Sequence, residues 1–392
     1  MANSRNPARP ALEVGLILFL PAVIVFVTVS TALHGDFSAA GCGFWRTLKL
    51  SVFGADNQGF TCTTLPFAVD LPSMLLGITS EVAVVNYLLL TKKLRTLDVR
   101  LAGGASGLFD AEQLEKEPMR KHYQDIKKWL SVRIRWQLLL LVAVFVLGVG
   151  FYYWVAGNNH WFKATATNQG VAHPSEAIQL GFRSSWWAAW DRNPGMAVAW
   201  IVIGSVGTYF ACCQAYIYYH LSRIFLAAPK SMVFRHVPAR IDRDHGWRPV
   251  GRIIAIAYLS SISFIFSVIA LIYILRDPDA STAVRIITNA ILIFVALGGT
   301  VLNIVLVATL RFGVAKTFAK TVRLRGIKLN QEIEDLRDGG DPLQARVAVI
   351  EAEHLAGEKT YPIQGTAVRV VSLLSGIIPV SKLLNDLFHL AF

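Results

Sequence analysis

The sequence predicts an all-α fold, namely a polytopic bundle of about six transmembrane helices with a cytoplasmic helical hairpin and a C-terminal interfacial helix. Six apolar runs are each long enough to cross a bilayer, because about 20 helical residues rising about 1.5 Å each span a hydrocarbon core of about 30 Å. Only 16% of the 392 residues are charged, whereas soluble domains carry about one quarter. The mean hydropathy of +0.47 agrees with this.

Five of the six runs have a core free of Asp, Glu, Lys and Arg, and the second differs because it contains Asp70 and Glu81. We expect its regular helix to begin at Leu71, because Pro72 suits the first helical turn. Residues 1–312 therefore form the predicted transmembrane domain. The predicted spans lie near 11–33, 65–91, 136–155, 195–218, 251–275 and 286–310.

The segments outside these spans also read as helical. Residues 111–135 form a charged helix that leads into the third span. Residues 313–392 form the predicted cytoplasmic part, in which two helices are joined by the turn DGGDP at 338–342. The apolar stretch 368–392 contains Pro379 and Lys382, which favour an interfacial or re-entrant helix over a seventh span.

The outer loop 156–194 contains a short helix that starts near Ser175. Four apolar residues recur there at every fourth position, which makes one apolar face. We favour an interfacial helix with its Trp side chains at headgroup level, and a lid over an outer vestibule is the alternative. The four residues are Ile178, Phe182, Trp186 and Trp190.

The net charge of +12 lies almost entirely in the segments predicted on one side of the membrane. The segments 1–10, 91–135, 219–252 and 311–392 hold 31 of the 38 Lys and Arg residues, and 17 of the 26 Asp and Glu residues. The outer loops hold 7 basic and 6 acidic residues. This positive-inside pattern places both termini in the cytoplasm and makes a nucleic-acid partner unnecessary.

The inner loop 219–252 interleaves prolines with basic residues. Its expected partners are the bilayer and its anionic lipids, and the alternative is a soluble anionic ligand such as a nucleotide. The basic residues expected to bind are Arg235, Arg240, Arg243 and Arg248.

Glu81 is the sharpest functional signal, because an ionised carboxylate near the centre of a span is costly and usually faces protein or water. At 100° per residue it shares a narrow sector with Asp70, Ser73, Gly77 and Ser80. One interpretation is a water-filled path with Glu81 as a cation or proton site. The other is a protonated Glu81 that binds another helix, with Asp70 as a helix cap.

Three other predicted spans carry small or polar residues at helical spacing, and these stripes could pack against this face of the second span. Ser260, Ser263 and Ser267 lie on the fifth span, Asn289 and Asn303 on the sixth, and Gly204 and Gly207 on the fourth. Each stripe alone is typical of close helix packing. The residues predicted to line a path are Asp70, Ser73, Glu81, Ser263, Ser267, Asn289 and Asn303.

The sequence predicts no enzyme, metal site or cofactor. The Gly204–Ser205 pair invites comparison with rhomboid proteases, but the sixth span has no histidine to activate the serine. The nine histidines lie in loops, in the tail or at helix ends such as His220, which disfavours haem. Cys42 and Cys62 share the first outer loop and are candidates for a disulfide.

Two segments resemble patterns found in uncharacterised bacterial multi-pass inner-membrane proteins. They are DRDHGWRPVG at 242–251, just before a span, and YPIQG followed by GIIPV within 361–380. The resemblance implies a bacterial inner-membrane protein and brings no function with it.

From these patterns we expect a homo-oligomeric channel or pore-type effector that is gated from the cytoplasmic side. One alternative is a non-transporting scaffold or sensor that anchors the cytoplasmic helices. A proton- or cation-coupled carrier is the third interpretation.

Overall fold

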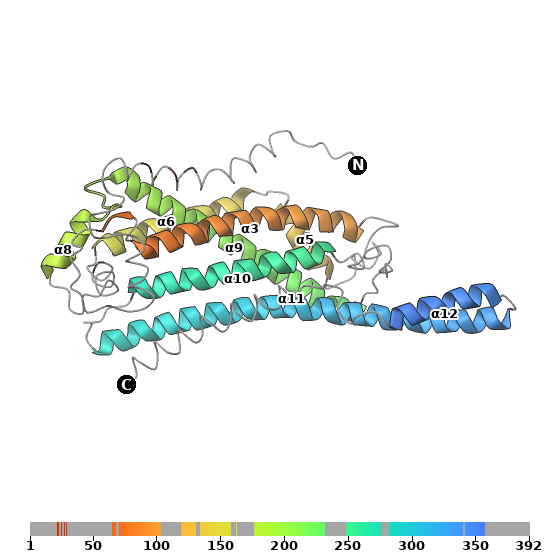
Figure 1. The fold of residues 1–392 in the computed structure, drawn as a ribbon. Helices are drawn as coiled ribbons and strands as arrows, with labels where there is room; N and C mark the ends of the chain where they lie inside the picture. The colour runs from red at the N-terminus through yellow and green to blue at the C-terminus, as the bar shows by residue number, and fades with distance from the viewer. Residues whose placement is uncertain are drawn as a thin grey trace. The chain divides into compact units, whose positions relative to one another are not determined.

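The computed structural model contains helices and turns throughout the part of the chain that it describes (Figure 1). This part comprises residues 65–67, 70–102, 119–130, 134–157, 176–231, 248–275, 282–339 and 342–356, with positions 22, 25, 27, 29 and 162. No strand occurs among these residues, which confirms the all-α class. The helices are α3 (Leu71–Ala102), α5 (Met119–Leu130), α6 (Ile134–Gly157), α8 (Glu176–Ser185), α9 (Pro194–Ser231), α10 (Arg248–Leu275), α11 (Thr282–Asp338) and α12 (Pro342–Ala356).

Four of the described helices are long and apolar enough to cross a membrane. They provide the segments Pro72–Arg95, Gln137–Gly157, Pro194–Leu226 and Val250–Ser267, which correspond to the second to fifth predicted spans. The first predicted span has only four described positions, and the sixth lies within α11. These four helices fit a membrane protein, and the total of six spans stays a prediction.

The helix ends differ from expectation mainly by being later. α3 begins at Leu71 as predicted but continues to Ala102. α11 joins the sixth predicted span and the first helix of the predicted cytoplasmic part into one helix of 57 residues. The expected break near 311–313 followed a change in hydropathy, but the sequence RFGVAK has no proline and only one glycine to end a helix. The helix therefore continues past the point where its sequence changes from apolar to more charged.

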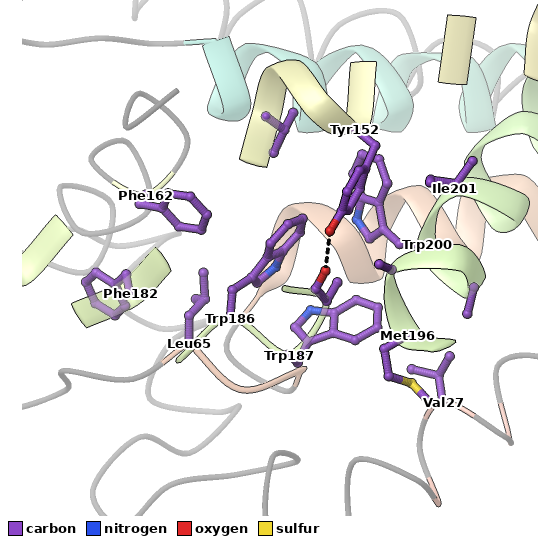
Figure 2. Close-up of a cluster of buried hydrophobic side chains, with 14 residues drawn as sticks. Val27, Leu65, Tyr152, Phe162, Phe182, Trp186, Trp187, Met196, Trp200 and Ile201 are labelled. Atoms are coloured by element: carbon purple, nitrogen blue, oxygen red, sulfur yellow. Dashed lines mark hydrogen bonds between the residues drawn. The ribbon is translucent and has the colours of Figure 1, made fainter. Parts of the chain in front are cut away.

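The chain forms two compact units, each assembled from three stretches. Unit 1 comprises residues 1–88, 134–213 and 260–302. One buried cluster in it is rich in aromatic residues, which Figure 2 shows around the start of α9. Tyr152 of α6 donates a hydrogen bond to the Ala188 carbonyl at 2.7 Å, the dashed line in Figure 2. The labelled members are Val27, Leu65, Tyr152, Phe162, Phe182, Trp186, Trp187, Met196, Trp200 and Ile201.

Unit 2 comprises residues 89–133, 214–259 and 303–392. Within it, α12 packs on the C-terminal part of α11. Arg325 of α11 forms an ion pair with Glu351 of α12 at 3.0 Å. A Cβ atom at Gly326 would lie 3.7 Å from the Leu355 side chain, so the two helices are in van der Waals contact.

Helices α9 and α11 also meet closely in unit 2. A Cβ atom at Gly313 would lie 2.6 Å from the Phe225 carbonyl oxygen. Four residues after Phe225, Pro229 has no N–H to donate to that carbonyl. The proline lies in the last turn of α9, so it removes one ladder hydrogen bond without ending the helix before Ser231.

Candidate functional site: the polar face of α3

Asp70 caps the N-terminus of α3. Its Oδ1 accepts a hydrogen bond from the Ser73 backbone N–H at 3.2 Å, which is the geometry of an N-cap. Its Oδ2 accepts a second hydrogen bond from the Ser73 hydroxyl at 2.6 Å. The cap that the sequence offered as one interpretation of Asp70 is therefore formed.

The same carboxylate also accepts hydrogen bonds from two tryptophans of unit 1. The indole N–H groups of Trp186 and Trp187 donate to Oδ2 at 2.8 and 2.9 Å. Trp200 donates to the Ser73 hydroxyl at 2.9 Å. An indole N–H is only a donor. The Ser73 hydroxyl therefore accepts a hydrogen bond from Trp200 and donates one to Asp70. The network fixes the chain after α8 to the start of α3.

Asp70 is fully buried, although it precedes the first residue of its span. Burial raises the pKa of Asp70 above its ordinary value, while the hydrogen bonds from Ser73, Trp186 and Trp187 act in the opposite direction. The four donors therefore compensate only part of the cost of placing a carboxylate here. The predicted role of Asp70 and Ser73 in a path stays untested, and their described contacts are all with protein.

The outer tryptophans do not all face the surroundings as expected of an interfacial helix. α8 ends at Ser185, and the chain then turns, so the four-residue spacing no longer defines one face. Trp186 and Trp187 are buried, whereas Trp190 is 45% exposed. The expectation assumed one continuous helix through Trp190. The buried Asp70 supplies the acceptor that makes the inward orientation favourable.

Helices α3 and α9 approach closely at one of the two predicted glycines. A Cβ atom at Gly207 would lie 2.7 Å from the Ser80 Cα atom. A Cβ atom at Gly204 would meet nothing within 4 Å. Thr208, one residue after Gly207, is exposed and donates to the Gly204 carbonyl of its own helix. Of these three residues on α9, only Gly207 is in tight contact with α3.

Helices α3 and α10 are joined by hydrogen bonds in unit 1. The Ser263 hydroxyl donates to the Thr79 carbonyl at 3.2 Å, and Asn86 Nδ2 donates to the Ser260 hydroxyl at the same distance. Ser267 instead donates to the Ser263 carbonyl within α10. Of the two path candidates on α10, only Ser263 contacts α3 through these hydrogen bonds.

Glu81 differs from its polar neighbours. Its side chain is half-buried, and its Oε2 atom is enclosed but has no hydrogen-bond partner among the described residues. Asp70, Ser73 and Ser263 all have such partners. Among these path candidates, Glu81 is therefore the one with a buried oxygen atom that accepts no hydrogen bond from the described residues.

Several predicted residues fall outside the described part of the chain. Asn289 and Asn303 lie in α11, but their side chains are not described. Arg248 is the first residue of α10, again without a described side chain. The remaining predicted positions are Arg235, Arg240, Arg243, Cys42 and Cys62, together with the C-terminal apolar segment. Cys212 and Cys213, which are described, are free thiols.

Sequence reasoning missed the tryptophan partners of Asp70 and also Asn86, which is fully buried. The signal available in the sequence for the tryptophan partners was an acidic residue at the end of a predicted span, together with a Trp-rich loop predicted on the same side of the membrane. It also missed a cluster of His122, Asp125 and His220 in unit 2. The i, i+3 spacing of His122 and Asp125 was visible, but their partner lies about 95 residues later in the chain.

No protein-family model matches this sequence, and no curated protein or solved structure matches it.

Proposed function

We propose that this membrane protein is a conduit, a channel or pore-type effector, in which Glu81 is the group that meets a cation or a proton. The observation that supports the proposal is the enclosed Glu81 Oε2 atom without a hydrogen-bond partner. Ten residues after Leu71, Glu81 lies well inside the span Pro72–Arg95.

The free-energy cost of this arrangement is the argument for a role. A charged residue at the centre of a span costs about 2.5–3.5 kcal/mol on insertion scales, and an unsatisfied buried polar group costs about 1–3 kcal/mol. The hydrogen bonds at Asp70 and Ser73 show that the fold supplies partners for the polar groups at the start of α3. A transported ion or proton is the partner that the proposal assigns to Glu81.

The proposal keeps the wider expectations from the sequence. The conduit is a homo-oligomer without catalytic activity, it lies in a bacterial inner membrane with both termini in the cytoplasm, and it opens from the cytoplasmic side. The basic residues Arg235, Arg240, Arg243 and Arg248 bind anionic lipids or a soluble anion there. These features rest on charge placement, on small-residue stripes and, for the bacterial inner membrane, on the resemblance of two short segments.

Reconstitution into liposomes tests the proposal. We expect purified full-length protein to carry monovalent cations or protons across the bilayer, and Glu81→Gln to change the rate or the ion preference of that flux. Glu332→Gln is the matched control, because Glu332 is exposed on α11 beyond the described spans. Slow saturable flux that Glu81→Gln abolishes would instead favour the carrier.

A non-transporting scaffold is the second candidate, and α12 favours it. Three apolar residues at helical spacing are exposed on this helix, which is typical of a face that binds another protein. They are Leu343 (76% exposed), Val347 (59%) and Ile350 (45%). Absence of any flux, together with a folded and stable Glu81→Ala variant, would favour the scaffold and contradict the conduit.

A further inference from the structure

Three side chains in unit 2 bring together the donor atoms of a metal site. His122 and Asp125 lie three residues apart on α5, so that both project from one face. His220 lies in the last two turns of the α9 segment Pro194–Leu226. One ligand atom from each of the three lies within 4.8 Å of the others.

The distances between these atoms fit a metal ion. The two Nδ1 atoms of His122 and His220 are 3.1 Å apart. With metal–nitrogen bonds of about 2.0–2.1 Å, ligand atoms are separated by about 3.3 Å in a tetrahedral site and about 2.9 Å in an octahedral one. The observed separation lies between these two values. The separation of the two nitrogens is therefore one at which both could bind the same ion.

The carboxylate lies farther from His220 than the imidazole of His122 does. Asp125 Oδ2 lies 3.9 Å from His220 Nδ1, about 0.6 Å longer than the tetrahedral separation. The side chain of Asp125 is 25% exposed, so rotation about its side-chain bonds is not prevented by tight packing. His220 is 9% exposed and supplies the more rigid position.

Aromatic rings pack beside the two histidines of the cluster. The Tyr216 ring lies 4.5 Å from the His220 ring, and Trp129 of α5 stacks on Tyr216 at 4.4 Å. Tyr219 contacts the His122 ring edge to face at 6.4 Å. These ring contacts restrict the orientations of the two imidazoles, as outer-shell contacts do for metal ligands.

We propose that His122, Asp125 and His220 bind a divalent transition-metal ion of the Zn²⁺ type. Two imidazoles and one carboxylate suit Zn²⁺, Co²⁺ or Ni²⁺, whereas Mg²⁺ and Ca²⁺ require mainly oxygen ligands. Three protein ligands leave a coordination position for water. The ion clamps α5, a helix of only 12 residues, to α9. This site is independent of Glu81 and adds metal-dependent regulation to the protein.

Metal titration of the purified full-length protein in detergent tests the proposal. We expect one Co²⁺ per chain, with visible d–d absorption typical of nitrogen and oxygen ligands, and displacement of Co²⁺ by Zn²⁺. His122→Gln and Asp125→Asn should each weaken Zn²⁺ binding by at least about 10–100-fold, since even loss of an outer-shell partner has that effect. His354→Gln on α12 is the matched control and should leave binding unchanged.

Hydrogen exchange of α5 provides a second measurement. Zn²⁺ should slow amide exchange in Met119–Leu130 of the wild type but not of Asp125→Asn, which preserves side-chain size. Far-ultraviolet circular dichroism of each variant shows that it is folded. A folded wild type without Co²⁺ absorption would overturn the proposal. Equal affinity in the wild type and both α5 variants would do so too, and the His122–His220 contact would then be a hydrogen bond between imidazoles.

Discussion

At the scale of single residues, the hydrogen bonds to Asp70 hold the chain after α8 against the start of α3. Trp187→Phe keeps the ring in the buried cluster but removes one donor to the carboxylate. We expect it to lower the free energy of unfolding by about 1.5–3 kcal/mol, the usual contribution of a hydrogen bond to a charged group. Thermal unfolding in detergent measures the effect. The control Trp190→Phe, at a side chain that is 45% exposed, should change stability by less than about 0.5 kcal/mol; equal effects would contradict the network.

The pKa of Asp70 gives a dependence of stability on pH. Burial raises this pKa above the ordinary value of 3.8, so the folded protein binds the proton more tightly than the unfolded chain. The stability that this provides is fully present below pH 3.8 and is lost as the pH rises through the raised pKa. The stability of the wild type relative to Asp70→Asn should therefore fall as the pH rises above about 3.8. Parallel pH profiles for the two proteins would show that Asp70 titrates normally.

At the scale of elements, the contact of α9 with α3 depends on Gly207. The Gly207→Ala change would place a methyl group 2.7 Å from the Ser80 Cα atom, so the helices must separate. We expect a loss of about 1–3 kcal/mol in the free energy of unfolding, as for other overpacked sites. The control Gly204→Ala has open space and should be neutral or stabilising by up to about 1 kcal/mol, because alanine favours a helix. A more stable Gly207→Ala protein would show that the helices are not tightly packed there.

The sequence predicted helices better than it predicted their ends and faces. The start of α3 at Leu71 followed from Asp70 and Pro72, which act locally. The continuation of α11 through residues 311–313 was missed, because hydropathy reports the solvent around a helix and not its hydrogen bonds. The inward orientation of Trp186 and Trp187 depends on an acceptor more than 110 residues away. Periodicity within the loop carries no information about that acceptor.

At the scale of the whole molecule, the charge distribution predicts that both termini lie in the cytoplasm. Single cysteines at Ser175 and Gln344, introduced into a chain without its four native cysteines, should react with an impermeant thiol reagent from opposite sides of the membrane. Ser175 precedes α8 and belongs to a predicted outer loop, whereas Gln344 lies in α12. Labelling of both positions from the same side would contradict the topology.

The claim that Glu81 faces a conduit is central to the proposed function, and ion selectivity in planar bilayers tests it most directly. We predict unitary currents for the wild type and a shifted reversal potential in an ion gradient for Glu81→Gln, because the substitution removes the carboxylate charge but preserves side-chain size. Glu332→Gln should keep the wild-type reversal potential. Identical reversal potentials for the wild type and Glu81→Gln, or no current from folded wild-type protein, would contradict the proposed role of Glu81.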